Sequence, residues 1–383
     1  MRVNRIPPLD LTRQYASLDA DVSAAVLAVL RSGRYIGGAA VSDFETVFAE
    51  YIGTPYAVGC NSGTDALYLA LRACDIGPGD EVITTPLTFI ATAEVICRVG
   101  ATPVFIDIDP TTFNLDPNRI APAITPRTKA IIPVHLFGRP VDMTAVIAIA
   151  QSHNLVVLED CAQSTGAMWA GQKVGSMGTV GCFSFFPTKN LGACGDGGAI
   201  TTGDEAIAHR IRQLREHGQS ERYIHTQTGL NSRLDALQAT ILAIKLRHLD
   251  HWNQQRQAVA QRYDTLLAQL PTITLPTAPP SGQAVWNQYT IRVADPQGDG
   301  SRRNGIQAIL QDQGISSMVY YPRPLHLQPV YQHLGYRQGD LPQAEQAAAE
   351  VLSLPMFPEL TPEEQEQVAY GLKAALAVHQ AKP

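Results

Sequence analysis

The sequence predicts an α/β protein whose sheet is largely parallel and covered by helices on both faces. Between Tyr56 and Thr201, short apolar segments with strand character alternate with segments of helical spacing. This alternation is typical of parallel sheets, because parallel strands need long crossover connections. With 383 residues, 45% of them hydrophobic, the chain is long enough for two domains.

The elements are expected in the following order. Helices are predicted at 18–31 and 41–51, on either side of the loop 32–38. Predicted strands at 56–60, 81–86, 102–109, 130–137 and 155–162 then alternate with helices at 67–74, 88–100 and 143–153. A helix-rich stretch at 204–219 and long helices after Gly229 follow.

The C-terminal part is expected to form a smaller α+β domain. Prolines cluster from Pro271 to Pro280, after the long helices, and mark a change of domain. Strands are predicted at 289–293 and 315–320, and helices at 302–313, 345–353 and 362–378. We divide the chain into a large α/β domain, residues 1–250, and a small domain, residues 251–383.

Composition and charge exclude several classes of protein. The net charge of −6 is spread without runs, which does not favour a nucleic-acid partner. No apolar run approaches the ~18 residues of a membrane span, and the first twenty residues lack the apolar core of a signal peptide. The six cysteines form no CxxC pair, so we expect reduced thiols in a cytoplasmic protein, with neither disulfides nor a metal site.

Lys189 stands out in the segment GCFSFFPTKNLGACGDGGAIT, residues 181–201. It is one of six lysines in the chain and lies between bulky apolar residues and a glycine-dense turn. Partial burial at the floor of a cleft would lower its pKa and make the amine a nucleophile, as Schiff-base chemistry requires. A surface lysine on an ordinary turn is the alternative interpretation.

Ligands of parallel sheets bind beyond the carboxyl ends of the strands, so the residues that follow each strand are the candidates. After the first strand, NSGTDA places Gly63 at the start of a helix, where free N–H groups and the helix dipole favour a phosphate. After the second strand, Phe89 is placed to stack on a flat ring, although a core position fits it as well. Ser184, five residues before Lys189, is a further candidate for the phosphate.

The strand LVVLEDCA ends on two carboxylates, Glu159 and Asp160. A buried acid is costly unless it meets a cation, and a protonated pyridine nitrogen would supply one worth roughly 4 kcal/mol at ~4 Å. Gln163 could then bond a ring hydroxyl. A helix N-cap is the alternative role for Asp160. A phosphate loop, a stacking aromatic, an acid and a lysine together match the needs of pyridoxal phosphate.

These segments resemble the DegT/DnrJ/EryC1/StrS family of sugar aminotransferases, which have the pyridoxal-phosphate fold type I of aspartate aminotransferase. The resemblance runs through nearly the whole chain, in GRYIGG, NSGTDALYLAL, TPLTFIATAEVI, PVHLFG, EDCAQSTGA, FSFFPTKNLGACGDGGAI, GLNSRLDALQATIL and YYPRPLHLQPVY. The order and spacing of these motifs make the resemblance specific.

The resemblance implies a role for each candidate. Lys189 is expected to be the Schiff-base lysine and Asp160 the partner of the pyridinium. The other expected cofactor contacts are Gln163 at the ring hydroxyl, Phe89 on the ring face, and Gly63, Thr64 and Ser184 at the phosphate. Asn231 is expected to reach the phosphate of the other subunit, which implies a homodimer. His217, Tyr320 and His326 are candidates for binding the sugar or the diphosphate of the substrate, with structural roles as the alternative. Tyr35 is a candidate from the sequence itself, because its loop is bounded by glycines: it would contact substrate or a partner subunit, and a simple connector is the alternative.

The implied reaction is a ping-pong transfer of an amino group from L-glutamate, giving 2-oxoglutarate, to a keto-sugar nucleotide, with pyridoxamine phosphate as the intermediate form. The motifs are most similar to enzymes that act at C3 of dTDP-linked 3-keto-6-deoxyhexoses. Action at C4, or on UDP sugars, is the alternative. Family members with histidine in place of the lysine are dehydratases, which Lys189 argues against.

Two other classes of protein, a dinucleotide-dependent enzyme and a regulator without catalysis, are the rival interpretations. GACGDGG has glycines near the spacing of a dinucleotide site, but it precedes a strand, whereas that fingerprint must follow a strand and open a helix. A non-catalytic regulator that has kept the fold is the second rival. Retention of Lys189, Asp160, Gln163 and Ser184 weighs against it.

Overall fold

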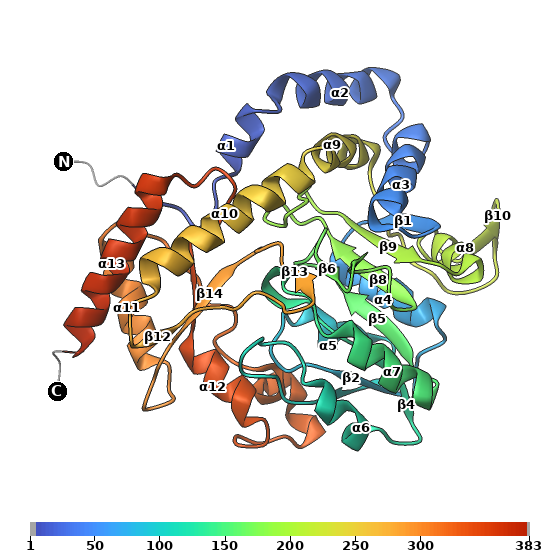
Figure 1. The fold of residues 1–383 in the computed structure, drawn as a ribbon. Helices are drawn as coiled ribbons and strands as arrows, with labels where there is room; N and C mark the ends of the chain where they lie inside the picture. Colours follow the sequence, from blue (N-terminus) through green and yellow to red (C-terminus); the bar gives the residue numbers. More distant parts are fainter. Residues whose placement is uncertain (1–4, 381–383) are drawn as a thin grey trace.

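The computed structural model describes residues 5–380, and its centre is a seven-stranded sheet (Figure 1). In spatial order its strands are β1 (Tyr56–Cys60), β9 (Gly198–Thr202), β8 (Val180–Ser184), β5 (Val156–Asp160), β4 (Thr128–Ile132), β2 (Glu81–Thr84) and β3 (Thr102–Phe105). From β8 to β3 every pair is parallel, and only β9 runs antiparallel to its neighbours β8 and β1. The predicted α/β class with a mostly parallel sheet is confirmed.

Helices cover both faces of this sheet because successive apolar residues of each strand point to opposite sides. In β4, Ala130 and Ile132 pack in one core cluster with helices α4 (Gly63–Ala73), α5 (Ala91–Arg98) and α8 (Glu205–Leu214). Ile131 packs on the other side, with α7 (Met143–His153) and the short α6 (Ile120–Ala123). Helix α3 (Ala39–Ile52) covers the β1 end of that second face.

The chain begins with α1 (Leu11–Ala16), which the sequence did not predict, and α2 (Asp19–Ser32). Figure 1 shows α2 (blue) lying over α9 (Ala236–Leu246), and the two share a small apolar cluster. Outside the main sheet, β10 (Gln219–Glu221) and β11 (Ile224–His225) form a hairpin, and β6 (Met168–Trp169) pairs with β7 (Gln172–Lys173) and β13 (Gly282–Gln283).

A second apolar core lies in the C-terminal part. It is built around an antiparallel sheet of β12 (Ile273–Thr274), β14 (Tyr289–Val293) and β15 (Val351–Leu354), with helices α10 (Leu249–Leu267), α11 (Ser301–Asp312) and α13 (Pro362–Gln380). Helix α12 (Pro342–Glu350) contacts β14 and packs against apolar residues of the segments that follow β2, β3 and β4. Ile6 belongs to the second core, so the N-terminal segment packs against the opposite end of the chain. The domain division at residue 250 stays a prediction.

Two local predictions are wrong. The segment 315–320, expected as a strand, makes only isolated bridges, from Ile315 to Ile6 and from Met318 to Ser353. The helix expected at 345–353 ends at Glu350, because the last residues form β15 and pair with β14. Both predictions failed because contacts with distant parts of the chain determine the backbone conformation of these segments.

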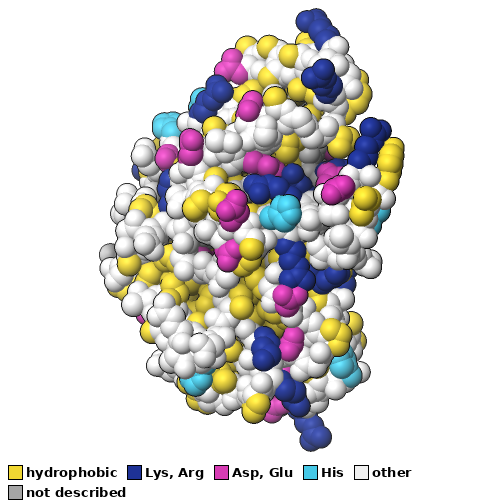
Figure 2. Space-filling model, turned by 90° about the vertical axis from the view of Figure 1, so that its right-hand side faces the viewer, with side chains coloured by type: hydrophobic (Ala, Val, Ile, Leu, Met, Phe, Trp, Pro, Cys, Tyr) yellow, Lys and Arg dark blue, Asp and Glu magenta, His cyan; other side chains and the backbone are white. Residues whose placement is uncertain are grey.

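On the face shown in Figure 2, side chains of both charges are interspersed and apolar side chains gather in a hollow. No continuous stripe of Lys and Arg is visible on that face, in keeping with the net charge of −6. Within residues 5–380, none of the helices combines the length and apolar character needed to cross a membrane.

Candidate active site

A cavity of about 450 Å³ lies at the carboxyl edge of the main sheet, within the size range of small-molecule sites. Its walls come from the start of α4, the segments after β2, β5 and β8, and two segments of the C-terminal part. Eight of the predicted site residues line it: Gly63, Thr64, Phe89, Asp160, Gln163, Ser184, Lys189 and Tyr320. Residues separated by more than 250 positions in the chain are thus brought to one place.

Lys189 lies on the tight turn that follows β8. Its backbone N–H donates to the carbonyl of Phe186 at 2.8 Å, and the turn is closed at Gly192, where a Cβ atom would collide with the carbonyl of Pro187. Burial lowers the pKa of the Lys189 amine, and the nearby Asp160 carboxylate partly opposes that shift. The amine therefore loses its proton more readily than an exposed lysine does.

Asp160 ends β5, and its carboxylate is held from two sides. Thr92 Oγ1 donates to Oδ2 at 2.9 Å, and the backbone N–H of Ala162 donates to Oδ1 at 3.1 Å. Burial raises the pKa of Asp160, whereas these two hydrogen bonds and the charge of Lys189 lower it. These hydrogen bonds fix the orientation of the Asp160 carboxylate. The sequence did not predict the contact with Thr92.

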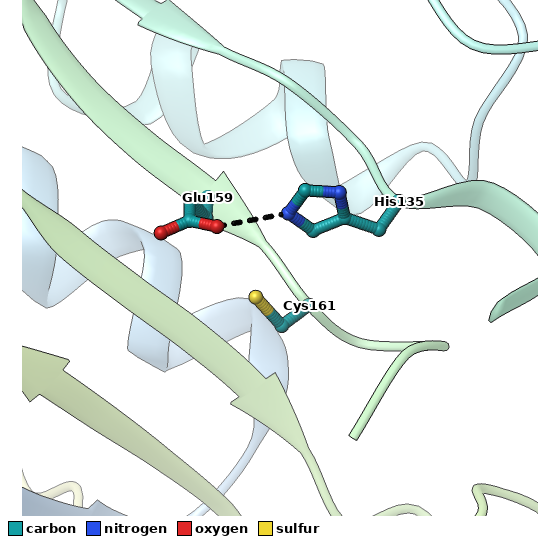
Figure 3. Close-up of side chains that lie close together, drawn as sticks. All are labelled: His135, Glu159 and Cys161. Carbon is teal, nitrogen blue, oxygen red and sulfur yellow. Dashed lines mark hydrogen bonds and ion pairs between the residues drawn. The ribbon is translucent and has the colours of Figure 1, made fainter. Parts of the chain in front are cut away.

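Directly beside Asp160, the side chains of His135, Glu159 and Cys161 form a buried cluster (Figure 3). His135 Nδ1 accepts a hydrogen bond from the backbone N–H of Val141 at 3.0 Å, so the proton of the ring must sit on Nε2. That nitrogen then donates to Glu159 Oε2 at 3.1 Å, as Figure 3 shows.

Glu159 also accepts three backbone N–H bonds, from the residues Gly175, Met177 and Gly178. Both of its oxygens and both ring nitrogens of His135 are therefore already engaged. His, Glu and Cys are all metal-ligating residue types. Because the polar atoms of His135 and Glu159 are already hydrogen-bonded, this cluster is better explained as a structural support for the end of β5 than as a cation site.

The start of α4 and the end of β8 meet at one corner of the cavity. Ser62 caps the helix, since its Oγ accepts the backbone N–H of Asp65 at 3.1 Å, and Gly63 and Thr64 open the first turn. A Cβ atom on Gly63 would lie only 2.6 Å from Ser184 Cβ, so glycine is needed for the helix to approach β8. The free N–H groups of the turn and the Ser184 hydroxyl can then serve one anion.

Gln163 and Phe89 line the cavity beside Tyr321. Gln163 Oε1 accepts the backbone N–H of Phe137 at 2.7 Å, and its Nε2 donates to the hydroxyl of Tyr321 at 3.3 Å. Phe89 is 57% exposed and its ring centroid lies 6.3 Å from that of Tyr321. An exposed aromatic face beside a cavity is available for stacking. The sequence singled out Tyr320 but not its neighbour Tyr321, which also lines the cavity.

Four predicted residues do not line the cavity within this chain. Tyr35 and Asn231 are exposed, and His217 lies before the β10–β11 hairpin with a left-handed backbone. Their predicted roles stay predictions. The ring of His326 is buried and its Nε2 bonds Glu345 at 3.1 Å, and its role in substrate binding also stays a prediction.

The main sheet is covered by helices on both faces and has one reversed strand, and a lysine, an acid and the start of a helix meet at its carboxyl edge. These features define a transferase of fold type I, the fold of aspartate aminotransferase. The chain belongs to the DegT/DnrJ/EryC1/StrS aminotransferase family, whose sequence profile matches residues 16–373. The predicted family and the predicted class of enzyme, an aminotransferase, are confirmed.

Relatives at similar identity carry different descriptions. A "pleiotropic regulatory protein" of Geobacillus stearothermophilus is 50% identical over 95% of this chain and 96% of its own length. A dTDP-3-amino-3,4,6-trideoxy-alpha-D-glucose transaminase of Streptomyces venezuelae is 46% identical over 93% of this chain and 92% of its own. A UDP-N-acetyl-3-dehydro-alpha-D-glucosamine 3-aminotransferase of Acidithiobacillus ferrooxidans is 46% identical over 97% and 98%.

Two solved structures have nearly the same fold. DesV of Streptomyces venezuelae, in complex with a ketimine intermediate, superposes with a TM-score of 0.91 at 44% identity and covers 98% of both chains. NtdA of Bacillus subtilis, with bound cofactor PMP, gives a TM-score of 0.90 at 34% identity, over 98% of this chain and 86% of its own.

Proposed function

We propose that this chain binds pyridoxal phosphate at Lys189 and transfers the amino group of glutamate to a keto-sugar nucleotide. The observation that carries the proposal is the meeting of Lys189 and Asp160 in one cavity with the start of α4. A reactive amine, a buried acid and an anion-binding corner are the three features that this cofactor requires of a protein.

The residues present fit the cofactor. Asp160 would pair with the pyridine nitrogen, Gly63, Thr64 and Ser184 would hold the phosphate, and Phe89 would cover the ring. The fit is supported by the lack of room for any Cβ atom at position 63, which keeps the helix start close to Ser184. Gln163 would turn its Nε2 from the hydroxyl of Tyr321 to the ring hydroxyl.

When bound, the cofactor supplies an electron sink for the pair of electrons released at the α carbon of the amino donor. Asp160 favours that sink because its negative charge holds a proton on the ring nitrogen. Lys189 carries the proton between the donor carbon and the acceptor carbon, which requires an amine that is neutral once released. The lowered pKa of Lys189 suits that task.

For the acceptor we propose C3 of a dTDP-linked 3-keto-6-deoxyhexose. Support comes from the Streptomyces venezuelae relative, whose name specifies a dTDP-3-amino sugar. The relative named for a UDP-3-dehydro sugar is equally similar and keeps UDP open as the nucleotide. Action at C4 of a UDP- or dTDP-4-keto-sugar is the alternative, and a panel of keto-sugar nucleotides analysed by mass spectrometry separates these possibilities.

A homodimer completes the proposal. The exposed Asn231 lies outside the cavity of its own chain, which is where a residue that serves the other subunit's phosphate would be placed. We also propose a cytoplasmic location, since all six cysteines are free thiols.

The second candidate function is a regulator without catalysis, favoured by the name of the Geobacillus relative. Incubation with glutamate and a keto-sugar nucleotide decides between them. We expect turnover by the wild type and by Lys129→Ala, which changes an exposed lysine of β4, but none by Lys189→Arg. Failure of the wild type to consume glutamate with any sugar of the panel would favour the regulator.

A further inference from the structure

Three buried asparagines, Asn190, Asn253 and Asn287, are bonded to one another beside the cavity. They come from three distant parts of the chain: the turn of Lys189, helix α10, and the segment that enters β14. Buried amides are costly unless they are paired. Their presence between two parts of the molecule therefore calls for an explanation.

Asn190 uses all the hydrogen bonds that the geometry allows it. Its Oδ1 accepts from Asn287 Nδ2 at 2.8 Å, and its Nδ2 donates to Asn253 Oδ1 at 2.8 Å and to the carbonyl of Val285 at 2.9 Å. Asn253 Nδ2 continues the network to the carbonyl of Thr165 at 3.2 Å. The network is saturated at its centre, which favours one fixed arrangement.

The segment Val285–Gln288 is held from its other side as well. The backbone N–H of Val285 donates to the carbonyl of Gly138 at 2.9 Å, and a Cβ atom on Gly138 would lie 2.8 Å from the nitrogen of Asn287. From α10, Arg256 donates to the carbonyl of Trp286 at 3.2 Å. The segment is thus fastened to the large sheet, to α10 and to Asn190.

The ends of this network reach the cavity. Lys189 is the chain neighbour of Asn190, and Lys189, Asn287 and Gln288 all line the cavity. A shift of the segment Val285–Gln288 would therefore reach the turn that carries the amine through these amides.

We propose that Asn190 and Asn287 are positioning residues for Lys189. They hold the turn of Lys189 against the segment Val285–Gln288, so that the distance between the amine and this segment stays fixed. The proposal rests on the function proposed above. Neither asparagine needs to touch the substrate, because their effect passes through the backbone of the turn and of the segment.

The test compares Asn190→Ala, Asn287→Ala and the double variant with Thr202→Ala as the control. Thr202 is also a buried polar residue, and its Oγ1 donates to the carbonyl of Thr179 at 2.8 Å, but it ends β9 outside the cavity and does not contact the segment Val285–Gln288. Thermal melting checks that each variant folds. Asn287→Ser, which keeps a shorter polar group, replaces any alanine variant that does not fold.

The first readout is the labelling of Lys189 by acetic anhydride in cofactor-free protein, followed against pH by mass spectrometry. We expect its midpoint to rise by about one pH unit in the Asn190 and Asn287 variants, because a loosened turn admits water to the amine. The Thr202 variant should keep the wild-type midpoint. An equal midpoint in all variants would overturn the proposal.

The second readout is kcat/KM with glutamate. Each single variant should lose about tenfold to hundredfold through misplacement of the amine, and the double variant no more than the worse single variant, because one link is broken in each. Additive losses would overturn the proposal. If wild-type protein forms no link to pyridoxal phosphate, the proposed function fails, while the labelling midpoints still decide on the asparagines.

Discussion

Asp160 shows how neighbouring side chains set the properties of a single acid. Burial raises the pKa of this carboxyl, and the hydrogen bonds from Ala162 and Thr92 lower it. Only the ionised form can hold a proton on a ring nitrogen. Thr92 is therefore expected to matter for activity although it is one of the simplest side chains at the cavity.

We predict that Thr92→Val lowers kcat/KM about tenfold to hundredfold, since a hydrogen bond to a charged group is worth roughly 1.5–3 kcal/mol. Loss of this donor raises the pKa of Asp160, so the acid limb of the pH profile should move to higher pH. Thr290→Val is the control, because Thr290 is buried and bonded to Ser353 away from the cavity. An unmoved acid limb would show that Thr92 does not tune Asp160.

The residues at the site were predictable to the extent that they follow strands. Lys189, Asp160 and Gly63 stand directly after apolar segments, and the rule that ligands lie beyond the carboxyl ends of parallel strands brings them together. Tyr321 and Asn287 were missed, because they reach the cavity from the C-terminal part and only the folded structure brings them there. The sequence analysis singled out the segment YYPRPLHLQP, but the spacing of its residues does not predict that the ring of His326 is buried.

At the scale of elements, the start of α4 and the end of β8 depend on each other. The helix predicted at 67–74 in fact begins at Gly63, so that its first turn brings its N–H groups close to Ser184. The longer strands and helices between β1 and β9 were predicted because each has its own periodicity, whereas the short α6, β6 and β7 were not predicted. The segments 315–320 and 345–353 were not, because pairing with Ile6 and with β14 decides their conformation.

We predict that Gly63→Ala weakens binding of pyridoxal phosphate at least tenfold. The new methyl group would meet Ser184 Cβ at 2.6 Å and push the helix start away from the strand. Binding is measured by absorbance titration. Gly203→Ala is the matched control, since a Cβ atom there meets nothing within 4 Å. Equal affinity in both variants would exclude a close contact of the phosphate with this corner.

At the scale of the whole molecule, the cavity lies between the main sheet and the C-terminal part, and the chain alone leaves Asn231 outside it. A symmetric pair of subunits would let each chain complete the site of the other. The sequence could suggest this arrangement only through resemblance, since no periodicity identifies a residue that acts on another chain.

We predict that two impaired variants, Lys189→Ala and Asn231→Ala, restore activity when their subunits are mixed by unfolding and refolding. In a hybrid dimer one site takes its lysine from one chain and its asparagine from the other, and is intact. Half of the dimers are hybrids with one intact site of two, so the mixture should reach about a quarter of wild-type activity. No gain over the separate variants would place Asn231 in its own chain's site, or outside any site.

The central claim is that the Lys189 amine carries the cofactor, and borohydride reduction followed by peptide mapping tests it most directly. Protein incubated with pyridoxal phosphate and reduced should yield one modified peptide, spanning Phe186 to Asn190, with the added mass on Lys189. Modification at another lysine, or none in protein that transfers amino groups, would contradict the account.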